Sequence, residues 1–125
     1  MLRDDSGSAV AEFVMVSALL TLLTLAVLQL GLALLVRNTL VDAAAEGARF
    51  GALADNSPRD GVDRTIDLIS TALGGGYARD VSARTGSYLG QPAVIVTVRA
   101  TLPLVGLLGP SGLEVSGHAA VETLR

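Results

Sequence analysis

The residues of this chain that could do chemistry are few, and the densest group surrounds a single histidine. His118 is the only histidine, and Glu114, Ser116 and Glu122 lie near it at alternate positions. On paper, such a set could supply ligands to a metal ion. Strand alternation alone places these residues in one row, however, whereas metal ligands must converge, usually from several elements. The pattern therefore predicts a solvated strand face and no metal.

A second group of charged residues follows the first proline. Asp60, Asp63 and Asp67 lie close to Arg59 and Arg64. Paired carboxylates could act as an acid and a base, or could hold a cation. Helical spacing offers a simpler interpretation, because acids and arginines three or four residues apart pair on a solvated helix face, as Asp60 and Arg64 would. We expect such a face here.

Composition excludes several classes of function. The 125 residues include no cysteine, which removes disulfides, thiol catalysis and cysteine zinc sites. No Ser/His/Asp arrangement stands out, and the run Gly74–Gly76 lacks the lysine and the strand–loop–helix context of a phosphate loop. The net charge is −3, and no part of the chain has a basic excess. We predict a non-enzymatic protein without cofactor, small-molecule substrate or nucleic-acid partner.

The lone carboxylate of Glu12 lies directly before a long apolar stretch. From Phe13 to Val36 there are 24 residues without a charge. A carboxylate at the edge of a membrane helix is costly unless it is paired, and a free α-amine on a neighbouring subunit would be a natural partner. The alternative is an ordinary acid in the headgroup region, favoured by the helix dipole. Both interpretations require that the apolar stretch enters a membrane.

Residues 13–36 exceed the roughly 20 residues that a helix needs to span a bilayer. A central helix of a soluble fold is the first alternative, but so short a chain leaves too little to wrap a helix that is apolar on every side. A secretory signal is the second, although its apolar region normally has about 7–15 residues. The run Ala43–Ala45 could mimic a signal cleavage site, and the secreted chain would then begin near Glu46. We favour a membrane helix.

The segment Gly7-Ser8-Ala9-Val10-Ala11-Glu12-Phe13 resembles the prepilin processing site of type IVb (Flp/Tad) pilins, G-x-x-x-x-E-[FY]. The short leader and small C-terminal region make the chain similar to the TadE-like pseudopilins. The resemblance implies leader cleavage between Gly7 and Ser8, with Glu12 and Phe13 as the assembly motif. It also implies a structural minor pilin or pseudopilin that contributes to a Tad-type pilus or a related secretion apparatus.

The resemblance further implies a location and partners. The protein would cross the cell membrane once, with a short cytoplasmic N-terminus and an extracytoplasmic C-terminal region. Its partners would be the membrane, a prepilin peptidase, other pilin or pseudopilin subunits and the Tad membrane-platform proteins. The domains would be a leader (1–7), a transmembrane and stalk helix (8–54) and a small α+β region (55–125). The alternative is an unprocessed single-span protein whose outer region is a binding module.

The membrane helix is predicted to continue to about Leu53, because the following residues are rich in alanine and lack proline. From Glu12 it would extend roughly 60 Å. Small residues recur along it every fourth position, which lets another backbone approach closely. Either the chain's own C-terminal sheet or the helices of sister subunits could pack there. This small-residue stripe comprises Ala43, Gly47, Gly51, Ala44, Ala48 and Ala52.

Beyond a break at residues 55–58 the pattern predicts a small α+β region. Ser57 is a plausible N-cap with Pro58 at the first helical position. A helix follows, with one apolar face formed by Val62, Ile66, Ile69 and Leu73.

After Gly74–Gly76 the period changes to two. The alternation predicts three strands, around residues 80–85, 94–102 and 113–122, in an antiparallel sheet that packs on the helices. The apolar stretch Leu102–Leu108 is expected to tuck under that sheet, although it could also meet the membrane or a partner.

Overall fold

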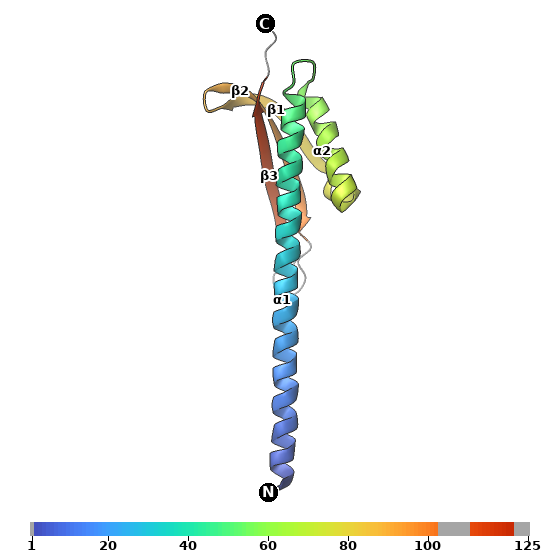
Figure 1. The fold of residues 1–125 in the computed structure, drawn as a ribbon, viewed down its shortest axis with the longest axis vertical. Coiled ribbons are helices and arrows are strands. Elements are labelled where there is room, and N and C mark those ends of the chain that lie inside the picture. The colour runs from blue at the N-terminus through green and yellow to red at the C-terminus, as the bar shows by residue number, and fades with distance from the viewer. Residues whose placement is uncertain (1, 103–110, 122–125) are drawn as a thin grey trace. The chain divides into compact units, whose positions relative to one another are not determined.

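A computed structural model describes residues 2–102 and 111–121, with only the backbone described for residues 2–5 and 111. The elements follow the order α1, α2, a short 3-10 helix, β1, β2, β3 (Figure 1). The chain divides into an N-terminal unit, Met1–Leu32, and a C-terminal unit, Ala33–Arg125. Helix α1 includes residues of both units.

Helix α1 comprises Leu2–Gly51, so it ends two residues before the predicted Leu53. The helix ends there because residues beyond it donate hydrogen bonds to a carbonyl group of its last turn. The side-chain amide of Asn56 donates a hydrogen bond of 2.8 Å to the carbonyl of Phe50, and the amide of Leu53 donates to the same carbonyl at 3.3 Å. These bonds satisfy a group that would otherwise be orphaned at the helix end, and they turn the chain toward the second helix.

Helix α2, Pro58–Leu73, begins where the sequence predicts. Ser57 is its N-cap and forms a capping box with Asp60: the Ser57 amide donates to the Asp60 carboxylate at 2.7 Å. The predicted pairing of Asp60 with Arg64 is therefore wrong, because the cap engages the carboxylate. Arg64 instead lies 3.8 Å from the carboxylate of Asp67.

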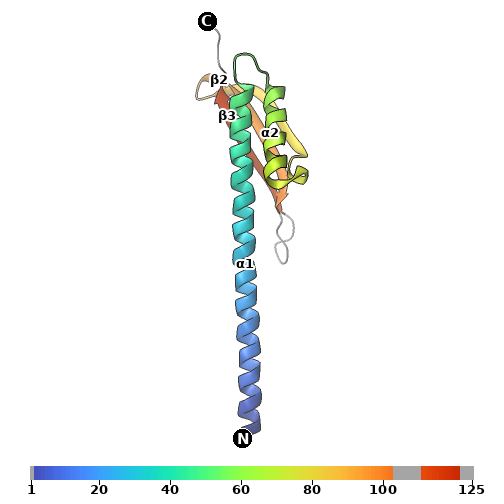
Figure 2. The ribbon, with the colours of Figure 1, turned by 45° about the vertical axis from the view of Figure 1, so that its right-hand side comes forward.

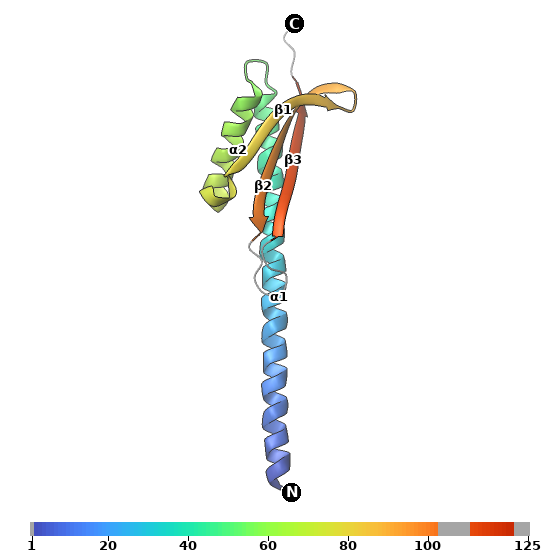
Figure 3. The ribbon, with the colours of Figure 1, turned by 180° about the vertical axis from the view of Figure 1, so that it is seen from behind.

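Three antiparallel strands form one sheet in the order β1-β2-β3: Asp80–Tyr88, Gln91–Leu102 and Ser111–Ala120 (Figure 3). The register is unbroken over both ladders. The strands confirm the predicted α+β, pilin-like fold class. Of the predicted apolar loop, Leu102 ends β2, and residues 103–110 lie outside the described residues.

The core of the C-terminal unit lies between one face of the sheet and the two helices. Helix α2 runs beside the C-terminal part of α1 (Figure 2). Alternate valines of β2, with Val115 of β3, meet Val36 and Leu40 of α1 and Ile69 of α2 in one buried cluster. Period-two alternation in the strands and the i, i+4 spacing in the helices both direct apolar side chains to this layer. The buried strand-β2 residues are Ala93, Val94, Val96 and Val98.

Leu40 gives a direct test of this core, because its side chain is 0% exposed. Leu40→Ala should lower the free energy of unfolding by about 2–5 kcal/mol through lost burial and a residual cavity. Leu53→Ala is the matched control, since Leu53 is 46% exposed and its truncation should cost within about 0.5 kcal/mol. Chemical unfolding of the full chain in detergent, followed by circular dichroism, measures both. Equal costs in the two variants would contradict this core.

Candidate assembly surfaces

The first candidate surface is the apolar helix of the N-terminal unit. Its large side chains are exposed throughout, with Phe13 at 73% and Leu19 at 66%. The apolar window of α1 has a mean hydropathy of 2.5, and only 6% of it is buried. A core helix of a soluble protein would be mostly buried, so this segment has the length and composition of a single membrane span or a signal sequence.

The predicted processing motif lies within this helix. Apart from its chain neighbours and the backbone of its own helix, Gly7 has no atom within 4 Å of the position that a Cβ would occupy. Ser8 and Glu12 are four residues apart on α1 and therefore share a face. None of the three ion pairs among the described residues involves Glu12.

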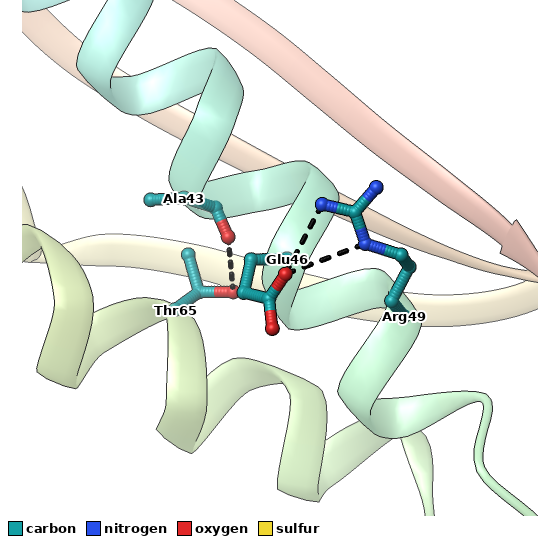
Figure 4. Close-up of polar contacts among 4 residues, drawn as sticks. All are labelled: Ala43, Glu46, Arg49 and Thr65. Carbon is teal, nitrogen blue, oxygen red and sulfur yellow. Dashed lines mark hydrogen bonds and ion pairs between the residues drawn. The ribbon is translucent and has the colours of Figure 1, made fainter.

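The second candidate surface, the small-residue stripe, divides between two partners in the same chain. Ala43, Gly47 and Gly51 meet α2. A Cβ built on Gly47 would overlap the hydroxyl of Thr65 and lie 2.7 Å from the carbonyl oxygen of Gly61. The Thr65 hydroxyl donates to the Gly61 carbonyl at 2.7 Å and lies 3.5 Å from the carbonyl of Ala43 (Figure 4). The two helices therefore touch backbone to backbone.

The other half of the stripe meets the sheet. Ala44 and Ala48 are 0% exposed, and Ala52 is nearly as buried. A Cβ on Gly117 of β3 would overlap the backbone of Ala44 and Ala45. All six stripe residues are thus buried by packing within the chain in this conformation.

Sequence reasoning missed three residues of this contact: Gly61, Thr65 and Gly117. The predicted apolar face of α2 comprised Val62, Ile66, Ile69 and Leu73, whereas the buried positions of that helix are Gly61, Thr65 and Ile69. A glycine inside a helical pattern costs about 1 kcal/mol relative to alanine, so Gly61 itself was a signal of close packing.

The outer face of the sheet is polar. Thr97 and Ser116 share a hydrogen bond of 3.2 Å, and Arg99 donates to Glu114 at 3.1 Å. The ring of His118 lies against that of Tyr88, with centroids 3.6 Å apart. Glu114 and His118 are therefore engaged with different neighbours, and no cluster of three His, Asp or Glu side chains within the described ranges could hold a metal.

A groove of about 490 Å³ is lined by residues of α1 and α2. Its apolar lining residues are Ala43, Ala45, Leu68 and Ala72. The lining also includes Glu46 and Arg49, which form an ion pair of 3.1 Å (Figure 4). Thr39 and Asp42 complete the lining.

The fold and the exposed apolar helix define a pilin-like α+β protein with one segment that could cross a membrane. The family model described as TadE-like protein matches residues 7–49, about a third of the chain. Over these residues the chain is similar to the TadE-like proteins, a family associated with assembly of the Tad pilus and generally structural. No curated protein and no solved structure matches the chain. The matched range contains the processing motif and ends before α2 and the sheet.

The contact at Gly47 gives a prediction. Gly47→Ala should destabilise the C-terminal unit by about 1–3 kcal/mol, because the new methyl group overlaps Thr65 and forces α2 away. This loss outweighs the gain in helix propensity of about 1 kcal/mol. Gly76→Ala is the control, since nothing lies within 4 Å of its Cβ position. Thermal unfolding measures both, and a Gly47→Ala variant as stable as the parent chain would refute the close approach.

Proposed function

We propose that this protein is a TadE-like, structural, non-enzymatic minor pilin or pseudopilin of a Tad-type pilus or related secretion apparatus. One observation carries the proposal. The C-terminal unit buries its own small-residue stripe, whereas the apolar side chains of residues 6–32 stay exposed. That second surface needs lipid or the helices of neighbouring subunits, and it includes the motif at residues 7–13.

The proposed processing divides the chain into a leader (1–7), a transmembrane and stalk helix (8–54) and an extracytoplasmic α+β region (55–125). A prepilin peptidase cuts between Gly7 and Ser8 at the cytoplasmic face. The mature subunit then remains in the cell membrane through residues 13–36 until the pilin or pseudopilin subunits and the Tad platform proteins receive it.

The proposed mechanism is helix packing with an ion pair between subunits. Cleavage frees an α-amine at Ser8, and Glu12 lies four residues further along α1. A parallel neighbour shifted along the helix by four residues, or about 6 Å, brings its amine level with Glu12. Such a pair gains little net stability in low dielectric, because desolvation opposes the attraction. Its main effect is to select that one register.

Processing is tested first. The mature protein from native membranes should begin at Ser8 when the host's prepilin peptidase is present, and at Met1 when the peptidase is absent. Intact mass and N-terminal sequencing distinguish the two forms. A chain that begins at Met1 in both strains would favour the alternative, an unprocessed single-span protein whose outer region is a binding module.

Glu12→Gln tests the ion pair. The variant should insert into the membrane normally but assemble poorly, because it leaves a neighbour's amine without its partner, at a cost of about 3–5 kcal/mol. Carbonate extraction measures insertion, and co-purification with sister subunits measures assembly. Asp63→Asn, which neutralises an exposed acid of α2, is the matched control. Normal assembly of Glu12→Gln would eliminate the mechanism.

A further inference from the structure

The sheet ends in two edge strands, and neither has the features that usually keep an edge from pairing. Strand β3 comprises ten residues and β1 nine. The register of both ladders is unbroken, so no bulge bends either strand, and neither strand contains proline or lysine. Proteins normally protect an edge with such features, because its free N–H and C=O groups are a template for another strand. Both edges of this sheet are therefore open to strand addition.

The backbone groups that are free at each edge follow from one hydrogen bond. The amide of Val121, directly after β3, donates to the carbonyl of Pro92 on β2 at 2.9 Å. Because the groups that face one neighbour alternate along an antiparallel strand, the even-numbered residues of β3, from Gly112 to Ala120, face away from β2. The same alternation carried across β2 leaves the odd-numbered residues of β1, from Val81 to Ser87, facing outward. No backbone hydrogen bond from outside the sheet reaches either set within the described residues.

The side chains at the two edges are complementary. On the face that packs on the helices, Leu113 of β3 and Ala83 of β1 are only half-buried at the margin of the core. On the polar face, Arg84 of β1 is exposed and is in none of the three ion pairs of the described residues. Glu114 of β3 pairs with Arg99, but its side chain is still 58% exposed. A contact that joins Glu114 to Arg84 would thus pair opposite charges on one face and apolar side chains on the other.

The strand directions allow such a contact between two copies in one membrane. Both β1 and β3 are antiparallel to β2, so they run parallel to each other. A parallel ladder between β3 and the β1 strand of another copy therefore leaves both copies in the same orientation. Strand β3 runs in the same direction as the C-terminal part of α1 (Figure 1). Antiparallel pairing of two β3 strands would instead reverse one copy with its α1, which two copies inserted in one membrane cannot accept.

We propose that β3 of one copy of this chain adds in parallel to β1 of a second copy, with Glu114 opposite Arg84 of the neighbour. In this register Leu113 lies beside Ala83 of the neighbour on the apolar face. The Glu114 amide donates to the carbonyl of that alanine, because the hydrogen bonds of a parallel ladder are slanted. A slide of four residues would place Glu114 opposite Asp80, a like charge. An exposed ion pair adds little affinity, so the backbone bonds hold the contact and the charges select its register.

The contact is heterologous and open-ended. Within one chain Asp80 and Glu114 lie at the same level, because both pair with Arg99. With Arg84 of the neighbour at that level, the second copy is displaced by four residues, or about 13 Å, along the strands. Each copy keeps one free β1 edge or β3 edge for the next, so addition can continue.

This inference rests on the proposed function and deepens it, because it makes another copy of this chain a partner. The ion pair at Glu12 displaces its neighbour by about 6 Å along the helix, which differs from the offset of the strands. The two contacts therefore join each copy to different neighbours, as separate contacts do in a helical array.

Cysteine cross-linking tests the contact, because the chain has no cysteine. Full-length protein in detergent carrying Ser82→Cys and Gly112→Cys should form a ladder of disulfide-linked oligomers on mild oxidation, since these positions lie opposite each other between copies. Both residues are exposed, and nothing lies within 4 Å of the Cβ position on Gly112. Within one chain β2 separates them by about 10 Å or more, beyond the reach of a disulfide.

The matched control carries Ser82→Cys with Ser116→Cys. These two positions lie at the same level of one sheet, so they would meet between copies only without the displacement. A ladder in the variant with Gly112→Cys alone supports the proposal. Equal ladders, a ladder in the control alone, no ladder, or no product beyond a dimer would overturn it.

Charge reversal gives a second, independent readout. Arg84→Glu places a like charge opposite Glu114 of the neighbour, so self-association of the chain, measured by sedimentation in detergent, should weaken by roughly five-fold. Adding Glu114→Arg to the same chain should restore it. Unchanged association, or a loss that the second substitution does not restore, would overturn the proposal. Leader cleavage is read separately by mass, so a failure here is distinct from a failure of the proposed processing.

Discussion

The C-terminal unit depends on one constraint, the absence of side chains where three backbones meet. Gly47 of α1 faces Gly61 and Thr65 of α2, and Gly117 of β3 faces Ala44 and Ala45. At each point a single added carbon atom would overlap a neighbouring atom. Because interiors are close-packed and transmit strain, a displaced α2 would also disturb the valine layer of β2 that it helps to cover. The position of both helices on the sheet thus follows from these few small residues.

Helix α1 presents two kinds of apolar surface, of which one is buried and the other is exposed. The small residues of the stripe between Ala43 and Ala52 are buried by contacts within the chain. The large residues of the N-terminal unit, such as Phe13 and Leu19, remain exposed. A membrane protein often uses small residues for association between helices, because lipid gives no hydrophobic drive. In this chain the small residues serve the fold, so the association in the membrane that we propose would rest on Glu12 and the large side chains.

Elements with strong periodicity were predictable from the sequence, and contacts between them were not. The valines of β2 alternate so regularly that strand and buried face follow directly, and Ser57 with Pro58 marks the start of α2. Thr65 has no such signature, since a threonine in a helix normally indicates a polar face. It is buried where Gly47 lies opposite it without a side chain. The contact of Asp60 was not predictable for a different reason, because its carboxylate has two potential partners nearby in the sequence. In the structure it accepts a hydrogen bond of 2.7 Å from the Ser57 amide and does not pair with Arg64.

Of the candidate sites, one could be predicted from the sequence, and the others depend on the tertiary fold. The processing motif is a pattern of neighbouring residues, so the sequence alone suggests it and a family match covers it. The groove and the open sheet edges are products of the tertiary fold. Nothing in Tyr88-Leu89-Gly90-Gln91 resembles the Asn-Gly signal of a tight hairpin, and only the pairing of Tyr88 with Gln91 reveals the turn.

The helical state of residues 2–12 has a consequence for the proposed cut behind Gly7. A peptidase must hold its target in an extended form, but this peptide bond lies in the second turn of α1. Removal of the leader therefore requires that the first turns of the helix unwind, and the rate depends on how often the end frays. A glycine weakens a helix by about 1 kcal/mol relative to alanine, so Gly7 destabilises those turns beside the bond that we propose is cut. In the mature form that we propose, the helix would begin at Ser8, and its positive dipole end would coincide with the freed amine.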